Sequence, residues 1–69
     1  MKTIDARGFS CPEPLLMLKN GLKSDEDILL MTDSKNATQN CEDFAKKKGF
    51  SVDVTQTEGD YHLQIRKAK

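Results

Sequence analysis

The stretch of the chain that decides its fold is FSVDVTQTEGDYHLQIR, residues 50–66. Apolar and polar side chains alternate in two runs, as in strands with one buried face. The inward-facing members are Phe50, Val52, Val54, Tyr61, Leu63 and Ile65. The sequence Glu58-Gly59-Asp60 between the runs is typical of a tight turn. The stretch therefore predicts a β-hairpin that turns one apolar face to a core.

A helix is predicted directly before this hairpin. Asn36 with Gln39 three residues later resembles a capping box, and Gly49 after three lysines is a stop signal. Between these limits the apolar residues follow a helical spacing. They are Ala37, Cys41, Phe44 and Ala45. This stripe places Cys41 in the core, so we expect a packing role for its thiol.

The N-terminal half predicts a strand, a helix and a second strand. The first strand covers Lys2–Ala6, and a glycine-containing loop follows it. The helix runs to about Leu22, with Leu15 and Leu18 on the same face. The run Ile28–Met31 is apolar throughout, and its shortness favours a buried strand over a helix.

The predicted element order is βαβαββ. A right-handed crossover makes the first two strands parallel, and the hairpin adds an antiparallel pair. We expect a two-layer α/β sandwich: a four-stranded mixed sheet with two helices on one face. With 69 residues, the chain has room for a single domain, residues 1–69, with one small core.

The composition and patterning of the chain argue against several classes of protein. Eleven basic and eleven acidic side chains cancel, which argues against a protein that binds nucleic acid through bulk charge. No apolar run approaches the ~20 residues that span a membrane, and no secretory signal is visible. Two cysteines are too few for a disulfide scaffold. These features predict a cytoplasmic protein that does not contact membranes.

A cysteine lies where the first helix is expected to begin, in the sequence GFSCPEP at residues 8–14. Proline is tolerated in a first helical turn, and the residue before a proline is pushed into extended conformation. Cys11 is therefore predicted to cap the helix, with its sulfur at the positive end of the helix dipole. Such a thiol is either a nucleophile or a small apolar cap. Because Glu13 repels a thiolate and Arg7 attracts one, we expect only a modestly lowered thiol pKa.

Other catalytic constellations are absent from the sequence. Alternation places His62 on the solvent face, so it is predicted to be a surface residue rather than a base for Cys11. Pro14 stands where a C-x-x-C motif has its second cysteine, and no cysteine–histidine cluster predicts a metal site. Asp5 and Asp33 follow predicted strands, where we expect them to cap turns.

The chain resembles the TusA/SirA/YedF family of small sulfur-carrier proteins. The resemblance starts with DARG at residues 5–8 and CPEP at residues 11–14, the family's C-P-x-P hallmark. It continues through residues 33–50 and the closing strand YHLQIR at residues 61–66, and it is strongest for the YedF-like branch. Cys41 stands where members commonly carry an aliphatic residue, which agrees with a core position.

The resemblance implies a two-layer sandwich that carries sulfur as a persulfide. Cys11 would be the acceptor thiol, and Pro12, Glu13 and Pro14 would shape its site. A donor protein such as a cysteine desulfurase would load it, and a downstream protein would receive the sulfur. The YedF-like branch extends this role to selenium metabolism. The resemblance implies no cofactor or metal, and a carrier that acts with partner enzymes rather than turning over alone.

An alternative function is a non-catalytic binding or regulatory module. Lys46, Lys47 and Lys48 form a basic cluster at the end of the second predicted helix, which is either a solvated helix end or a docking patch for a partner protein. Arg7 is a further candidate docking residue beside Cys11. A nucleic-acid-binding domain is the third class, and the zero net charge and few aromatic residues argue against it.

Overall fold

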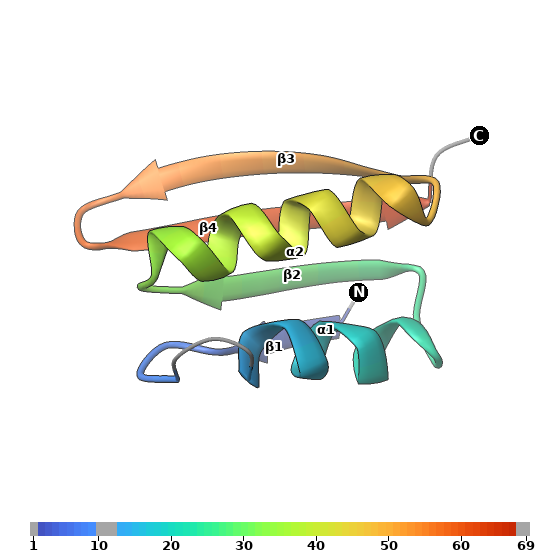
Figure 1. Ribbon diagram of the computed structural model, residues 1–69, viewed down its shortest axis with the longest axis horizontal. Coiled ribbons are helices and arrows are strands. Elements are labelled where there is room, and N and C mark those ends of the chain that lie inside the picture. Colours follow the sequence, from blue (N-terminus) through green and yellow to red (C-terminus); the bar gives the residue numbers. More distant parts are fainter. Residues whose placement is uncertain (1, 10–12, 68–69) are drawn as a thin grey trace.

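A computed structural model describes residues 2–9 and 13–67 of the chain. Its helices and strands follow the predicted order βαβαββ (Figure 1). The elements are β1 (Lys2–Asp5), α1 (Glu13–Leu22), β2 (Asp27–Thr32), α2 (Lys35–Lys47), β3 (Phe50–Thr57) and β4 (Asp60–Lys67).

The four strands form one mixed sheet in the order β1-β2-β4-β3. β1 and β2 are parallel, whereas β2 pairs with β4, and β4 with β3, in antiparallel fashion. Both helices lie on the same face of the sheet (Figure 1). The predicted two-layer α/β sandwich is confirmed.

The core lies between the helices and the two central strands. Its largest fully buried aliphatic side chains are Leu18, Ile28, Leu30, Leu63 and Ile65. The helical stripe predicted for α2 faces this core, because three of its four members are buried: Ala37, Cys41 and Ala45. The prediction that Cys41 is a core residue is confirmed, since its side chain is 0% exposed.

Gly21 marks the closest approach of α1 to the sheet. A Cβ atom at this position would lie 2.9 Å from Ile4 Cδ1 and 3.0 Å from Ile28 Cδ1. Glycine costs a helix ~1 kcal/mol relative to alanine. Here the missing side chain leaves room for the isoleucines of β1 and β2, so the last turn of α1 packs directly on the sheet.

The predicted start of α2 was wrong by two residues. Ser34, not Asn36, is the N-cap, with an extended backbone and a side-chain oxygen that accepts from the Ala37 N–H. Thr32 Oγ1 accepts from the Ser34 N–H at 3.2 Å, and the Thr38 hydroxyl donates to the Ser34 carbonyl at 2.9 Å. Ser34 thus has its side chain, its N–H and its carbonyl all hydrogen-bonded at the point where β2 ends and α2 begins.

The hairpin also differs from prediction at one residue. Val54 was expected to face the core, but its side chain is 40% exposed. β3 is an edge strand, and Figure 1 shows α2 lying over β4 and β2 rather than over the far half of β3. Alternation therefore gives the correct face of the sheet at Val54, but no helix covers that part of the face.

Candidate functional site

The loop after β1 and the start of α1 lie at one end of the molecule. The end of β2, the start of α2 and the β3–β4 turn lie at the same end (Figure 1). We call residues 6–9 with Glu13 and Pro14 the N-terminal corner. Cys11 and Pro12 belong to the sequence between these two parts, outside the described residues. The predicted capping role of Cys11 and the orientation of its thiol therefore stay predictions.

The loop that leads to Cys11 is attached through its backbone N–H groups to β2 and to Asp33, which follows β2. The Ala6 N–H donates to the Met31 carbonyl at 2.7 Å, one residue beyond the end of β1. The Gly8 N–H donates to the Asp33 carboxylate, at 3.3 and 3.4 Å from its two oxygens. Gly8 has φ +87°, a backbone conformation that favours glycine. Asp33 therefore acts as the predicted turn cap, although the turn it caps follows a different strand.

Arg7 is held by two carboxylates from distant parts of the chain. Its Nε and Nη2 each lie 2.9 Å from an oxygen of Asp5, in a bidentate pair. Its Nη1 lies 3.4 Å from Asp60 Oδ2 at the start of β4. The hydrogen bonds from Arg7 lower the pKa of Asp5 to about 2 and raise the pKa of Arg7. Arg7 thus links β1 to the hairpin, and its charge is already engaged by acidic partners.

This pair predicts a measurable titration. In a carbon-13 NMR titration, the Asp5 carboxyl should titrate with a pKa of about 2, below its ordinary 3.8. Arg7→Gln should raise the midpoint towards 3.8, because the guanidinium hydrogen bonds are lost while the backbone N–H of residue 7 still donates to Asp5. Lys47→Gln, remote in sequence, should leave it unchanged. Because the folded-state pKa is depressed, the pair stabilises the fold above pH 3.8, and this contribution is lost as the pH falls towards 2. Equal midpoints in the parent protein and Arg7→Gln would contradict the pairing.

On the other side of Cys11, Pro14 attaches the start of α1 to the core. Its ring is fully buried, whereas Glu13 before it is exposed. Glu13 lies in the first turn of α1, where a carboxylate complements the helix dipole. The two described ends of the corner are therefore both fixed, one by hydrogen bonds and one by burial of Pro14.

The corner also exposes apolar surface. Phe9 and Leu16 are each 45% exposed. They lie on the two sides of Cys11 in the sequence, one in the loop and one in α1. Phe9 thus adds exposed apolar surface to the corner, and Leu16 adds it to α1 two residues after Pro14.

A comparison with known protein families matches residues 2–67 to the family described as "Sulfurtransferase TusA". The chain belongs to this family. The match covers all six helices and strands described above, and it agrees with the family resemblance of the C-P-x-P sequence.

Two further proteins are similar to this TusA-family chain over nearly its full length. "Putative sulfur carrier protein MJ0990" of Methanocaldococcus jannaschii is 32% identical, and the alignment covers 97% of this chain and 95% of that protein. The crystal structure of a SirA-like protein from Desulfitobacterium hafniense superposes with a TM-score of 0.87 and 24% identity, and covers 100% of both chains. The latter shows that the fold is shared.

The other candidate residues of this TusA-family chain do not belong to the corner. His62 is half-buried on the sheet face opposite the helices, in register with Met31 and Thr55. Within residues 2–9 and 13–67, no group of three histidine, cysteine or acidic side chains is placed to hold a metal ion. No helix in the described part of the chain is long and apolar enough to cross a membrane.

The three lysines of the predicted docking patch have different surroundings. Lys46 forms an ion pair with Glu42 at 2.8 Å, which raises its pKa. The Lys48 ammonium lies 5.8 Å from the centroid of the Phe44 ring, and Lys47 is exposed. Lys19, which the sequence did not single out, lies over the same ring at 5.3 Å. Only the packing of α1 beside α2 brings Lys19 to this aromatic ring.

Proposed function

We propose that this protein is a sulfur carrier that takes up sulfane sulfur on Cys11 and passes it to an acceptor protein. Membership of the sulfurtransferase TusA family and the description of the archaeal relative as a sulfur carrier support this role. One observation carries the proposal: the cysteine of the C-P-x-P sequence stands two residues before a helix. The buried Pro14 holds the first turn of that helix against the core.

The proposed loading step is a thiolate exchange at sulfur. The Cys11 thiolate attacks the outer sulfur of a donor persulfide, a new S–S bond forms, and the donor S–S bond breaks. The donor leaves as a thiolate, so no external oxidant or reductant is needed. In the second step, an acceptor thiolate attacks the outer sulfur of the Cys11 persulfide, and Cys11 returns to its thiolate form.

The described structure supports this chemistry in two ways. The second thiol of the chain, Cys41, is fully buried in the core, so it does not compete for sulfur in the folded protein. The corner lies at one end of a small molecule and exposes Phe9, as expected for a site that large partners approach. Sulfur transfer needs two such partners, a donor protein and an acceptor protein.

Intact-protein mass spectrometry tests the proposal directly. The parent protein should gain one sulfur atom after incubation with a cysteine desulfurase and cysteine, and dithiothreitol should remove it. Cys11→Ser should show no gain, because the acceptor thiol is missing. Cys41→Ala is the matched control, and it should load as the parent does. Loading that persists on Cys11→Ser would sink the proposal, as would failure of the parent to load from either the desulfurase or polysulfide.

The similarity to the YedF-like branch extends the proposal to selenium, because the same exchange at Cys11 can carry the heavier element. Loading from an equal mixture of a donor persulfide (R–S–SH) and the corresponding donor with selenium as its outer atom (R–S–SeH) distinguishes the two by mass. Preferential gain of selenium would support the selenium role, and gain of sulfur alone would restrict the carrier to sulfur.

The alternative of a non-catalytic binding module makes a different prediction at the same residue. Such a module would keep its partner binding and its cellular function in Cys11→Ser. A carrier would lose function in this variant, even if it still bound its partners.

A further inference from the structure

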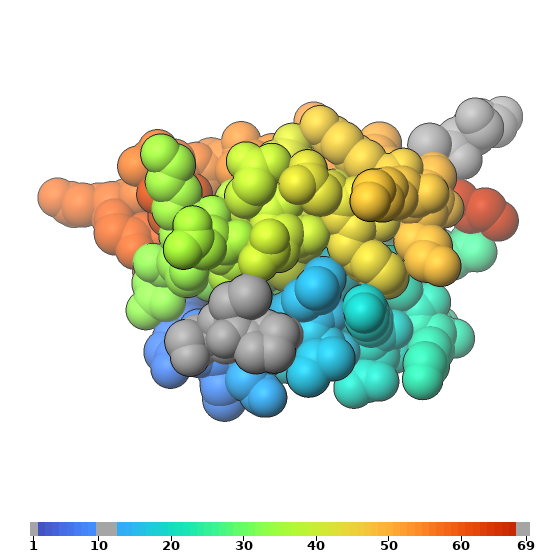
Figure 2. Space-filling model, viewed as in Figure 1, coloured from blue at the N-terminus to red at the C-terminus, as the bar shows by residue number. Residues whose placement is uncertain are grey.

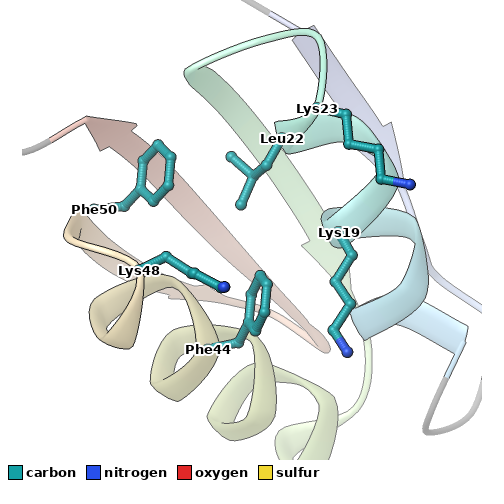
Figure 3. Close-up of a pocket in the computed structure, with 6 residues that line it drawn as sticks. All are labelled: Lys19, Leu22, Lys23, Phe44, Lys48 and Phe50. Carbon is teal, nitrogen blue, oxygen red and sulfur yellow. The ribbon is translucent and has the colours of Figure 1, made fainter.

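An open groove lies between the C-terminal ends of the two helices and the start of β3 (Figure 3). It has a volume of about 480 Å³. The lining residues, which we call the lysine groove, are Lys19, Leu22, Lys23, Phe44, Lys48 and Phe50. The groove lies on the face where the side chains of α1 and α2 meet (Figure 2).

The floor of the groove is apolar. Leu22, Phe44 and Phe50 are half-buried and pack against the core from outside. In Figure 3 the side chains of Leu22 and Phe50 face each other across the groove, and Phe44 rises from α2 beside them. The floor can therefore receive an aliphatic or aromatic side chain, which would lose its contact with water there.

The rim of the groove is cationic and lacks acidic partners. The ammonium groups of Lys19 and Lys48 lie 5.3 and 5.8 Å from the centroid of the Phe44 ring. Within the described part of the chain, neither forms an ion pair, and neither does Lys23. The acidic residues of the molecule that form ion pairs do so with other cations. For example, Glu42 pairs with Lys46. The rim thus offers positive charge that an incoming carboxylate can neutralise.

The position of the groove favours a protein segment as its occupant. α1 runs from Glu13, two residues after Cys11, to Leu22 in the groove, a length of ~14 Å at ~1.5 Å per residue. A protein interface of standard size buries ~800 Å² on each partner, a patch roughly 30 Å across. One partner can therefore reach Cys11 and fill the groove at the same time.

We propose that the lysine groove binds an acidic segment of a partner protein. An apolar side chain of that segment lies against Phe44 and Phe50, and flanking carboxylates pair with Lys19 and Lys48. The proposal rests on the carrier function proposed above, because a carrier must dock on the proteins that load and unload Cys11. It assigns docking to a surface formed by α1, the C-terminal end of α2 and the start of β3, which includes Lys48 but not Lys46 or Lys47.

The probe for this site is the blocked peptide Ac-DEFLED-NH2, titrated into the full nitrogen-15-labelled chain. Saturable chemical-shift changes should centre on the groove residues. The double variant Lys19→Glu/Lys48→Glu should weaken binding by about tenfold or more. The matched control Lys35→Glu/Lys47→Glu has the same net charge and should weaken binding by less than about threefold. The spectra report in the same experiment whether each variant is folded.

Two control peptides separate the contributions of the floor and the rim. Ac-QNFLNQ-NH2 lacks the carboxylates and Ac-DESGED-NH2 lacks the apolar pair, and both should bind more weakly than the probe. Absence of saturable binding, or shifts centred on the corner or the open sheet face, would overturn the proposal. Binding of octanoate in the groove without binding of the probe would also overturn it, in favour of a small amphipathic anion.

The experiments distinguish an incorrect groove proposal from an incorrect carrier proposal. Polysulfide is too small to need docking, so Lys19→Glu/Lys48→Glu should still gain sulfur on Cys11 from polysulfide. If the parent loads from polysulfide but does not bind the probe, the groove proposal fails and the carrier proposal stands. If the parent binds the probe but never loads, the carrier proposal fails instead.

Discussion

Leu18→Ala is expected to leave much of the protein unfolded. Leu18 is 0% exposed, and it belongs to the core cluster that joins α1 to the sheet. Truncation of a buried leucine to alanine costs ~2–5 kcal/mol, because apolar contacts are lost and a cavity remains. A core of this size rarely supplies more than ~3–5 kcal/mol, so the substitution removes most of the stability. Urea denaturation followed by far-UV circular dichroism should show a folded baseline that is shortened or absent.

Leu16→Ala is the matched control on the same helix. Leu16 is 45% exposed, so the same change should shift the free energy of unfolding by less than about 0.5 kcal/mol. Equal stabilities of the two variants would contradict the packing of α1 described here. The pair also separates surface from core on one helix, since Leu16 is exposed and Leu18 is fully buried.

Cys41 is expected to react with iodoacetamide about 10²- to 10⁴-fold more slowly in the folded protein than in urea. Its side chain is 0% exposed, so modification requires opening of the core. If the fold is stable by ~3–5 kcal/mol, about one molecule in 10² to 10⁴ is open at any moment, since each ~1.4 kcal/mol corresponds to a factor of ten. The reaction rate falls by the same factor. The measurement uses Cys11→Ser, in which Cys41 is the one remaining cysteine of the sequence, and follows alkylation by intact-protein mass spectrometry.

The protection of Cys41 should depend on the same core as Leu18. Adding Leu18→Ala to Cys11→Ser should abolish the slow reaction, whereas adding Leu16→Ala should preserve it. Similar alkylation rates in buffer and in urea for Cys11→Ser alone would show that Cys41 is accessible. A gain of sulfur by the parent protein could then have occurred on either Cys11 or Cys41.

Local patterns in the sequence were sufficient to predict the architecture. The alternation in residues 50–66 predicted the hairpin, and the α2 stripe correctly placed Cys41 in the core. The errors arose where neighbours in space decide the outcome. Asn36 matches the capping pattern better than Ser34, but only Ser34 is next to Thr32 at the end of β2. Val54 alternates correctly, but its exposure depends on which strands α2 covers, and β3 is at the edge of the sheet.

The candidate site was predictable only in part. The C-P-x-P sequence drew attention to Cys11 and its neighbours, because a short motif can be recognised without a structure. The partners of Arg7 and Gly8 were not predictable, since Asp60 and Asp33 lie 53 and 25 residues further along the chain. The lysine groove was missed for the same reason, because Lys19 and Phe44 become neighbours only when α1 packs beside α2.

The contact between Arg7 and Asp60 is one of the last contacts of this loop that can form while the chain is being synthesised. A ribosome makes Cys11 early and Asp60 late, and domains acquire their long-range contacts only after the participating segments have emerged. The loop before Cys11 can therefore bond to Met31 and Asp33 before the last hairpin has emerged, and it gains its contact with β4 only when that hairpin docks. A nascent or truncated chain that ends before β4 keeps the bonds of this loop to Met31 and Asp33 but lacks the ion pair of Arg7 with Asp60, which is the last of the three attachments to form.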